Sequence, residues 1–505
     1  MASEASNSIS APKMTGVIFT NLVVALPWII GAFITLSAHE IFAQKGKSCN
    51  TDTPDFELEN ASAVVSDSGM PRALVIGAGG FIGYCVWGVL LLSLNQLGFK
   101  PFQEALIWAL LFFTISATII WFTVNKNFDQ VLSAKQGRIF SSFPSFLILL
   151  VIILITYQTT VPVVAWDALH YWAIHAERFI LSSLIDYPGA EFSGDLGHPP
   201  MIIVILAWSG WVSEYLGNSQ VSTPWMLNGI SLLLITYGAA LLLLRNRIIS
   251  SVLALCVLTL PLVEQHLSLA GYAEAWLSSG VLLSVSLLMQ GFKVNNIWMI
   301  SWGLIAAFIL LFIKNTGFLY ASVIWAAVLL TLVFPAFARA ARTRPRETSL
   351  IFLATIFLFY LVAAAAIESC TEATCFISGS YVLSAEGFSV EEMIFNERHS
   401  LFINASFSVS GLIIVIGTWG IISHVAYRSS IDQDLIFIYS ATIFLLLIPI
   451  LTQLFLYDFW LGRLYATPTN DTGNSRLTIP FAVVSVTLFA RLCLECESDV
   501  CGHSR

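Results

Sequence analysis

The chain has 505 residues, of which 57% are hydrophobic and only 11% are charged, and its mean hydropathy is +0.82. A soluble domain carries about 25% charged residues, so this composition excludes a soluble enzyme and indicates an all-α polytopic protein whose surroundings are the lipid bilayer. The formal net charge is −8, from 23 basic and 31 acidic residues, without a basic stripe, which argues against nucleic acid as a partner.

Apolar runs long enough to cross a membrane recur along the whole chain. About 20 apolar residues span the hydrocarbon core, and the need to pair every backbone group there forces a helix. We predict about 13 spans. They lie near residues 16–38, 72–96, 103–124, 143–163, 223–244, 248–264, 275–291, 297–313, 318–336, 349–367, 408–427, 434–457 and 478–494. A shorter run at 200–216 is expected to enter the bilayer only partway, and the first span is interpreted as an anchor because it lacks a cleavage site.

Basic residues gather in a few short loops, which the positive-inside rule places in the cytoplasm. The clearest cluster covers residues 339–346, with weaker ones at 126–138, 245–247 and Lys293. This orientation predicts that the external segments are residues 164–199, 265–274, Lys314, 368–407 and 458–477. It requires residues 200–244 to cross the membrane an odd number of times, and it leaves the parity of the N-terminal spans open.

An amphipathic helix is predicted in the first half of the 164–199 loop. The apolar stripe consists of Leu169, Trp172, Ala176 and Phe179, and the opposite stripe of Asp167, Tyr171, His175 and Arg178. A helix with two such faces lies in the membrane interface, where it would hold Asp167 at the boundary with water. Taken alone, Asp167 fits better as a carboxylate that satisfies backbone amides at a helix start, and only the motifs described next favour a functional role.

Four more polar motifs interrupt apolar sequence on the expected external side. They are His198-Pro199-Pro200, Gly271-Tyr272-Ala273-Glu274, Lys314-Asn315-Thr316-Gly317 and Arg476 upstream of Pro480. Each has a structural alternative: prolines start helices, Glu274 complements a helix dipole, and Lys314 snorkels to the interface. Taken together, carboxylates that accept a proton and cations that neutralise a phosphate are the groups needed for transfer from a lipid phosphate.

These four motifs and the run from Trp166 to Trp172 occur in the order and spacing of bacterial GT-C glycosyltransferases, which the chain resembles. The similarity is greatest to the group of protein O-mannosyltransferases and aminoarabinose transferases, and it covers roughly residues 140–490. It implies a bundle of membrane helices with interfacial helices in an extracytoplasmic loop. It also implies transfer of a sugar, with inversion, from a polyprenyl-phosphate donor to an external acceptor (lipid, glycan or protein) at the periplasmic face of a bacterial inner membrane.

The resemblance also implies catalytic roles. Asp167 matches the loop aspartate that acts as general base or orients the acceptor, and Glu274 matches a second carboxylate in the cavity. His198 stands where the family has His-Pro-Pro or Lys-Pro-Pro, near the donor phosphate. No metal ligands are assigned to the site and no cofactor is required by the motifs, although the use of a divalent metal stays open.

The remaining site residues are expected to bind substrate. Lys314 and Arg476 match cations that hold the donor phosphate, and His170 and Tyr171 are expected to contact the substrate. Thr316 replaces the glutamate of the family's Lys-Asn-Glu-Gly pattern, so any role of that acid is lost here.

We divide the chain into N-terminal helices at 1–140, a GT-C-like catalytic region at 141–495 and a tail at 496–505. The best-known relatives have one span before the catalytic loop, whereas four are predicted here. The extra helices are therefore either an accessory module or the mark of a different branch. The external loops 164–199 and 368–407 belong to the catalytic region.

Two other functions compete with a glycosyltransferase. A lipid or solute transporter would also hold ionisable groups in a cavity, but it favours paired repeats, which are not apparent. A polysaccharide polymerase or ligase would use a large external loop with arginines, and the 368–407 loop holds only Arg398. Zinc-like spacing at residues 493–503 and a pairing of Cys370 with Cys375 are weaker signals.

Overall fold

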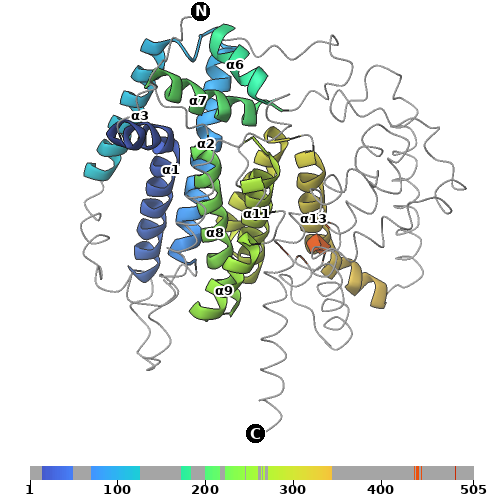
Figure 1. The fold of residues 1–505 in the computed structure, drawn as a ribbon. Coiled ribbons are helices and arrows are strands. Elements are labelled where there is room, and N and C mark those ends of the chain that lie inside the picture. Colours follow the sequence, from blue (N-terminus) through green and yellow to red (C-terminus); the bar gives the residue numbers. More distant parts are fainter. Residues whose placement is uncertain are drawn as a thin grey trace, which may run out of the picture.

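The computed structural model describes residues 14–48, 70–124, 172–182, 199–216, 222–244, 246–259, 271–314 and 316–343, with single positions at 263, 266, 267, 437, 440–442, 445 and 484. Every regular element within these residues is a helix, which confirms the all-α class for the described part (Figure 1). The elements are α1 (Met14–Ser48), α2 (Arg72–Gln96), α3 (Glu104–Val124), α6 (Ala173–Ser182), α7 (Met201–Tyr215), α8 (Thr223–Leu244), α9 (Arg247–Leu258), α11 (Glu274–Lys293), α12 (Ile297–Ile309), η2 (Leu310–Phe312) and α13 (Thr316–Thr343).

Four of the described helices are long and apolar enough to cross a membrane. They cover Ile18–His39, Arg72–Asn95, Thr223–Leu244 and Glu274–Lys293, close to the spans expected near 16–38, 72–96, 223–244 and 275–291. Helices also form at the spans expected near 103–124, 248–264, 297–313 and 318–336, but their apolar stretches are shorter. The total of about 13 spans stays a prediction, since the five near 143–163, 349–367, 408–427, 434–457 and 478–494 lie outside the described residues, apart from a few single positions.

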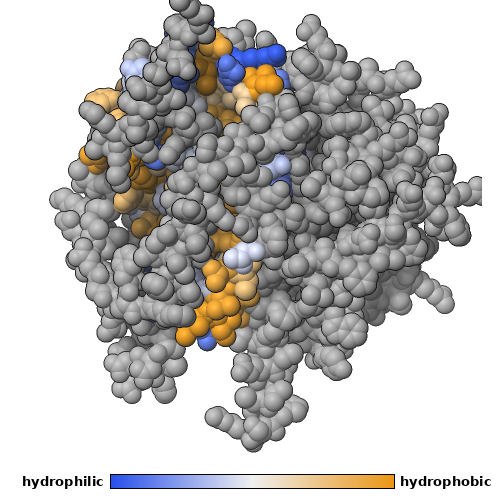
Figure 2. Space-filling model, in the orientation of Figure 1, coloured by the Kyte–Doolittle hydropathy of each residue, from blue (hydrophilic) through white to orange (hydrophobic). Residues whose placement is uncertain are grey.

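Large apolar side chains project outward from these helices. Phe112, Phe113 and Trp298 are each more than 70% exposed, a cost that a protein in water would avoid and that lipid removes. Figure 2 shows such apolar surface over the lower part of the bundle, where α9 lies in Figure 1 and exposes Ile248 and Ile249. Both observations support a bilayer as the surroundings of the bundle.

The first two spans approach closely because glycines line their contact. A side chain on Gly83 would overlap the carbonyl of Pro27, and one on Gly79 would overlap Thr35, so neither position has room for a Cβ. Gly79 and Gly83 form a small-xxx-small pattern, which lets membrane helices pack backbone to backbone. The Thr35 hydroxyl donates to the Val75 carbonyl of α2 at 3.2 Å, which joins the two helices at this crossing.

The short apolar helix α7 lies across one end of the bundle instead of running parallel to the spans (Figure 1). Its 15 residues extend about 22 Å, too short to cross about 30 Å of hydrocarbon. The indole N–H of Trp208 donates to the Val24 carbonyl of α1 at 3.3 Å. Within residues 200–244 the structure therefore describes one helix long and apolar enough to cross a membrane, α8, and the shorter apolar helix α7. The partial entry of residues 200–216 into the bilayer stays a prediction.

Helix α6 confirms the amphipathic pattern in the part of the 164–199 loop that the structure describes. Trp172, Ala176 and Phe179 are buried, and Arg178 is exposed. The assignment of His175 to the exposed stripe is wrong, since this side chain is only 7% exposed. Helix α6 packs against α7, so it is covered by other parts of the protein in a way that the pattern of a single interfacial helix does not include.

The starts of α8 and α11 lie at one end of the bundle, and the connections that carry Arg247 and Lys293 lie at the other end. The Trp225 indole at the start of α8 bonds to the Tyr272 carbonyl just before α11, so these two helices begin at the same end. The short connections to α9 and α12 lie at the other end (Figure 1). Arg247 and Lys293, which were expected on the cytoplasmic side, therefore lie at the opposite end of the bundle from Glu274 and Lys314.

Candidate functional site

The Gly271–Glu274 motif forms the entrance to α11. Gly271 has φ = +107°, a conformation that is open to glycine and strained for other residues. The ring of Tyr272 packs 4.5 Å from that of His266, centroid to centroid. Glu274 follows as the first residue of α11 and is only 4% exposed, so the motif delivers a carboxylate to the buried start of a helix.

The Lys314–Gly317 motif lies where two helices break. Helix α12 tightens into the 3₁₀ turn η2, and α13 begins at Thr316. The Gly317 N–H donates to the Lys314 carbonyl at 2.8 Å, and a Cβ on Gly317 would overlap the Leu310 carbonyl. Glycine is therefore required here by the close approach of the new helix to the preceding turn, and the turn carries Lys314 inward.

The two motifs meet in a buried ion pair. The Lys314 ammonium donates to Oε1 of Glu274 at an Nζ–Oε1 distance of 2.5 Å, although the residues are 40 positions apart. Their side chains are only 10% and 5% exposed, respectively. A charged side chain at such depth needs a partner because desolvation is expensive. The structural alternative in which Lys314 snorkels to the surface is therefore wrong.

Two features favour a charged carboxylate at this place. Glu274 occupies the first turn of α11, where the helix dipole stabilises negative charge. The short contact with Lys314 is a charge-assisted hydrogen bond, which is stronger than a neutral one. The pair thus brings one anion and one cation together, and these are two of the groups that the sequence assigned to the site.

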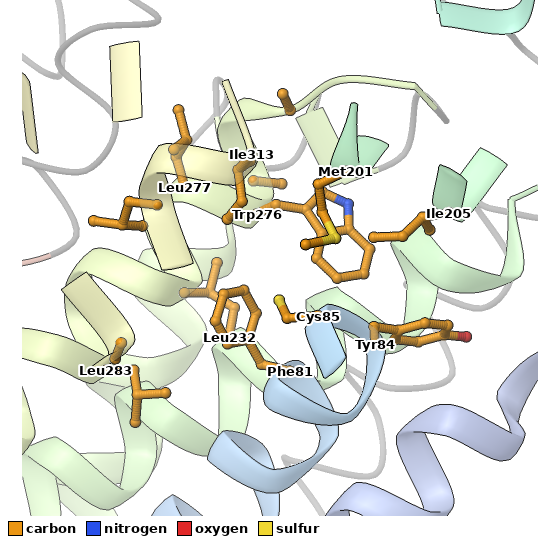
Figure 3. Close-up of a cluster of buried hydrophobic side chains, with 14 of the residues drawn as sticks. Phe81, Tyr84, Cys85, Met201, Ile205, Leu232, Trp276, Leu277, Leu283 and Ile313 are labelled. Atoms are coloured by element: carbon orange, nitrogen blue, oxygen red, sulfur yellow. The ribbon is translucent and has the colours of Figure 1, made fainter. Parts of the chain in front are cut away.

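An apolar wall surrounds the start of α11. Trp276 packs edge-on against Trp225 of α8 and Tyr84 of α2, with ring centroids 6.0 and 5.5 Å apart. Leu277, Trp276 and Ile313 belong to one buried cluster, which also takes in Met201 of α7 (Figure 3). Such walls exclude water and strengthen electrostatic interactions between the groups that they enclose.

Of the seven predicted site residues, the structure brings Glu274 and Lys314 together. The other five, Asp167, His170, Tyr171, His198 and Arg476, lie outside the described residues. The end of the His198-Pro199-Pro200 motif is described: α7 begins directly after Pro200, as expected of a helix-starting proline. Met201, the next residue, belongs to the same buried cluster as Trp276.

Two buried residues of α8 escaped the sequence analysis. Trp225 is completely buried and donates its indole N–H to the Tyr272 carbonyl at 2.8 Å. Asn228, one turn further along α8, is also completely buried, and its amide finds no hydrogen-bond partner among the residues that the structure describes. An amide inside an apolar run was a visible signal for Asn228, whereas a tryptophan in a membrane span gives none.

The described residues hold no group of three or more His, Cys, Asp or Glu side chains that could bind a metal ion. The cysteines at 493–501 and the Cys370–Cys375 pair lie outside the described residues. No family model, curated protein or solved structure matches this chain. The resemblance to GT-C glycosyltransferases therefore rests on the five sequence motifs.

Proposed function

We propose that this protein is a membrane glycosyltransferase of the GT-C type, which moves a sugar from a polyprenyl-phosphate donor to an acceptor outside the cytoplasm. The observation that supports this most directly is the buried Glu274–Lys314 pair, which joins two of the five motifs at one end of a helical bundle. On this proposal the end of the bundle that holds the pair faces the periplasm, and the end with Arg247 and Lys293 faces the cytoplasm.

The proposed reaction requires a cation beside the departing phosphate, and we assign this role to Lys314. Breaking a glycosyl–phosphate bond builds negative charge on the phosphate and positive charge on the sugar ring, so a cation beside the phosphate acts more strongly in the transition state than in the ground state. An ammonium has three N–H donors. Lys314 can therefore contact a phosphate oxygen while Glu274 holds another of its donors and fixes its direction.

The acceptor side needs a base. A phosphate leaves readily, so the leaving group needs no general acid. The acceptor hydroxyl, however, must lose its proton as it attacks the anomeric carbon. Attack from the face opposite the phosphate gives inversion. We assign this proton to Asp167, with His170 and Tyr171 orienting the substrate and His198 and Arg476 completing the phosphate contacts. A positioned base contributes about 10²–10⁴ in rate.

Transfer by isolated membranes tests the proposal. Membranes that contain the protein are incubated with a series of radiolabelled polyprenyl-phosphate sugars, and labelled products are separated from the donor. We expect product from at least one donor and a loss of about 10²–10³-fold in Lys314→Met, by analogy with removal of one transition-state donor. Lys293→Met, an exposed lysine at the other end of the bundle, is the matched control and should keep full activity.

The same membranes separate the rival functions. If none of the labelled donors is consumed while a labelled lipid or solute equilibrates across vesicles in a way that depends on Lys314, the protein is a transporter. If only a diphosphate-linked glycan is consumed, it is a polymerase or ligase. Full transfer by Lys314→Met would contradict the assigned role of the lysine.

A further inference from the structure

Within the residues that the structure describes, no side chain caps the start of α11. Helices α9 and α12 each begin with an asparagine, Asn246 and Asn296, whose side chain accepts hydrogen bonds from backbone N–H groups of the first turn. Helix α11 begins instead after Ala273, which has no side chain that can cap it. Glu274 could have closed this end, but its carboxylate bonds to Lys314.

A side chain of another helix fixes this end. Trp225 of α8 is completely buried, and its indole N–H donates to the Tyr272 carbonyl at 2.8 Å. The same ring packs edge-on against Trp276, with centroids 6.0 Å apart and an interplanar angle of 84°. Trp225 thus contacts the chain two residues before Glu274 and two residues after it.

We propose that Trp225 is a positioning residue that sets the geometry of the Glu274–Lys314 pair. Gly271, with its positive φ, gives the preceding turn freedom that the indole bond then removes. Rotation of α11 about its own axis would carry the carboxylate away from the ammonium. A displacement of about 1 Å in a catalytic group can cost about 10²-fold in rate, so a single hydrogen bond at this point has a large effect.

The predicted effect of Trp225 on catalysis rests on the proposed function, whereas its predicted effect on the Glu274–Lys314 contact does not. The geometric test uses a hydrophobic carbodiimide, which reacts with protonated carboxyl groups inside membranes. An ammonium partner favours the ionised carboxylate, so a well-formed pair protects Glu274. The labelled fraction of the peptide that contains Glu274 is measured by mass spectrometry at one fixed pH, with Glu274→Gln as the blank.

Four variants decide the geometric question. Trp225→Phe keeps a buried ring and loses the N–H donor, and we expect Glu274 to be labelled at least threefold faster, in the direction of Lys314→Met. In Trp225→Phe/Lys314→Met the rate should equal that of Lys314→Met alone, because the tryptophan acts through the pair. Trp208→Phe removes an indole–carbonyl bond of the same kind from α7 and should label like the parent.

In the transfer assay, Trp225→Phe should lower kcat/KM for the donor about tenfold with an unchanged KM for the acceptor. It should have no further effect in the Lys314→Met background.

The labelling test has three further outcomes. Labelling of Trp225→Phe at the parental rate, beside faster labelling of Lys314→Met, would overturn the positioning role and leave the proposed function standing. Unchanged labelling in Lys314→Met would overturn both the pair and the role of Trp225. Faster labelling of Trp225→Phe without transfer by any variant would uphold the positioning role and refute the glycosyltransferase. Trp225→Leu, which has no hydrogen-bond donor in its side chain, replaces the phenylalanine variant if the latter does not accumulate in membranes.

Discussion

Removing one member of the Glu274–Lys314 pair should destabilise the bundle far more than removing both. Lys314→Met leaves a carboxylate at the buried start of α11, and Glu274→Gln leaves an ammonium in the same apolar surroundings. Loss of one partner of a buried ion pair typically costs about 3–5 kcal/mol. The Coulomb attraction at an effective dielectric constant of about 20 is about 6–7 kcal/mol for unit charges at 2.5 Å, and the cost of removing both groups from water offsets most of it.

The combined variant Glu274→Gln/Lys314→Met contains neither charge, and both new side chains approximate the shape of the originals. Replacement of a whole buried pair is often neutral. We therefore expect it to recover more than half of the stability that Lys314→Met loses. The free energy of unfolding is measured by denaturant titration in mixed micelles, with Glu214→Gln and Lys293→Met as exposed controls that should change by no more than about 0.5 kcal/mol.

Stability and activity should separate in this series. The combined variant should be nearly as stable as the parent and yet fail to transfer sugar, because the cation that holds the donor phosphate is gone. Strictly additive losses of stability would show that the two side chains do not interact in the membrane. A stable combined variant with parental transfer would refute the assignment of Lys314 to the donor phosphate.

Three other substitutions test the structure and the assigned base. Gly317→Ala should destabilise the bundle by about 1–3 kcal/mol in the same titration, because the new methyl group overlaps the Leu310 carbonyl. Gly210→Ala is its matched control, since a Cβ there meets only a side-chain carbon at 3.7 Å, and it should be neutral or slightly stabilising. Gly83→Leu should separate α1 from α2 and lower the midpoint of thermal unfolding in detergent. Asp167→Asn should keep that midpoint and donor binding while it abolishes transfer to the acceptor, and parental transfer would remove the base assignment.

The sequence allowed accurate prediction wherever the bilayer itself sets the rule. The span expected at 223–244 coincides with Thr223–Leu244, because the thickness of the hydrocarbon fixes how long an apolar helix must be. The amphipathic period of α6 was equally readable. His175 was misplaced because the periodicity within one helix does not reveal which other parts of the protein will cover it.

The sequence identified which residues belong to the candidate site, but it did not predict which of them contact one another. Polar motifs in apolar surroundings identified Glu274 and Lys314 separately, but their contact depends on how α11 and α13 are rotated about their axes. Trp225 could not be identified, because its role lies in one N–H group that points at a backbone carbonyl of another helix. A buried tryptophan elsewhere in the bundle has the same sequence signature.

The position of the pair at helix ends follows from the physics of the membrane. In the middle of a span every backbone N–H is used within the helix, so a charge there receives no help from the backbone. At the first turn of α11 the helix dipole stabilises a carboxylate, and the break before α13 lets Lys314 reach it without crossing a helix. A chain that must hold an anion and a cation in an apolar bundle is therefore expected to place them at helix ends, the carboxylate where α11 begins and the ammonium just after η2 ends. On the proposed function, this is also where a lipid-linked phosphate would arrive. The need to place these charges at helix ends explains why Glu274 and Lys314 each lie in a short motif with a glycine, Gly271 or Gly317, at a tight turn or close approach of the backbone.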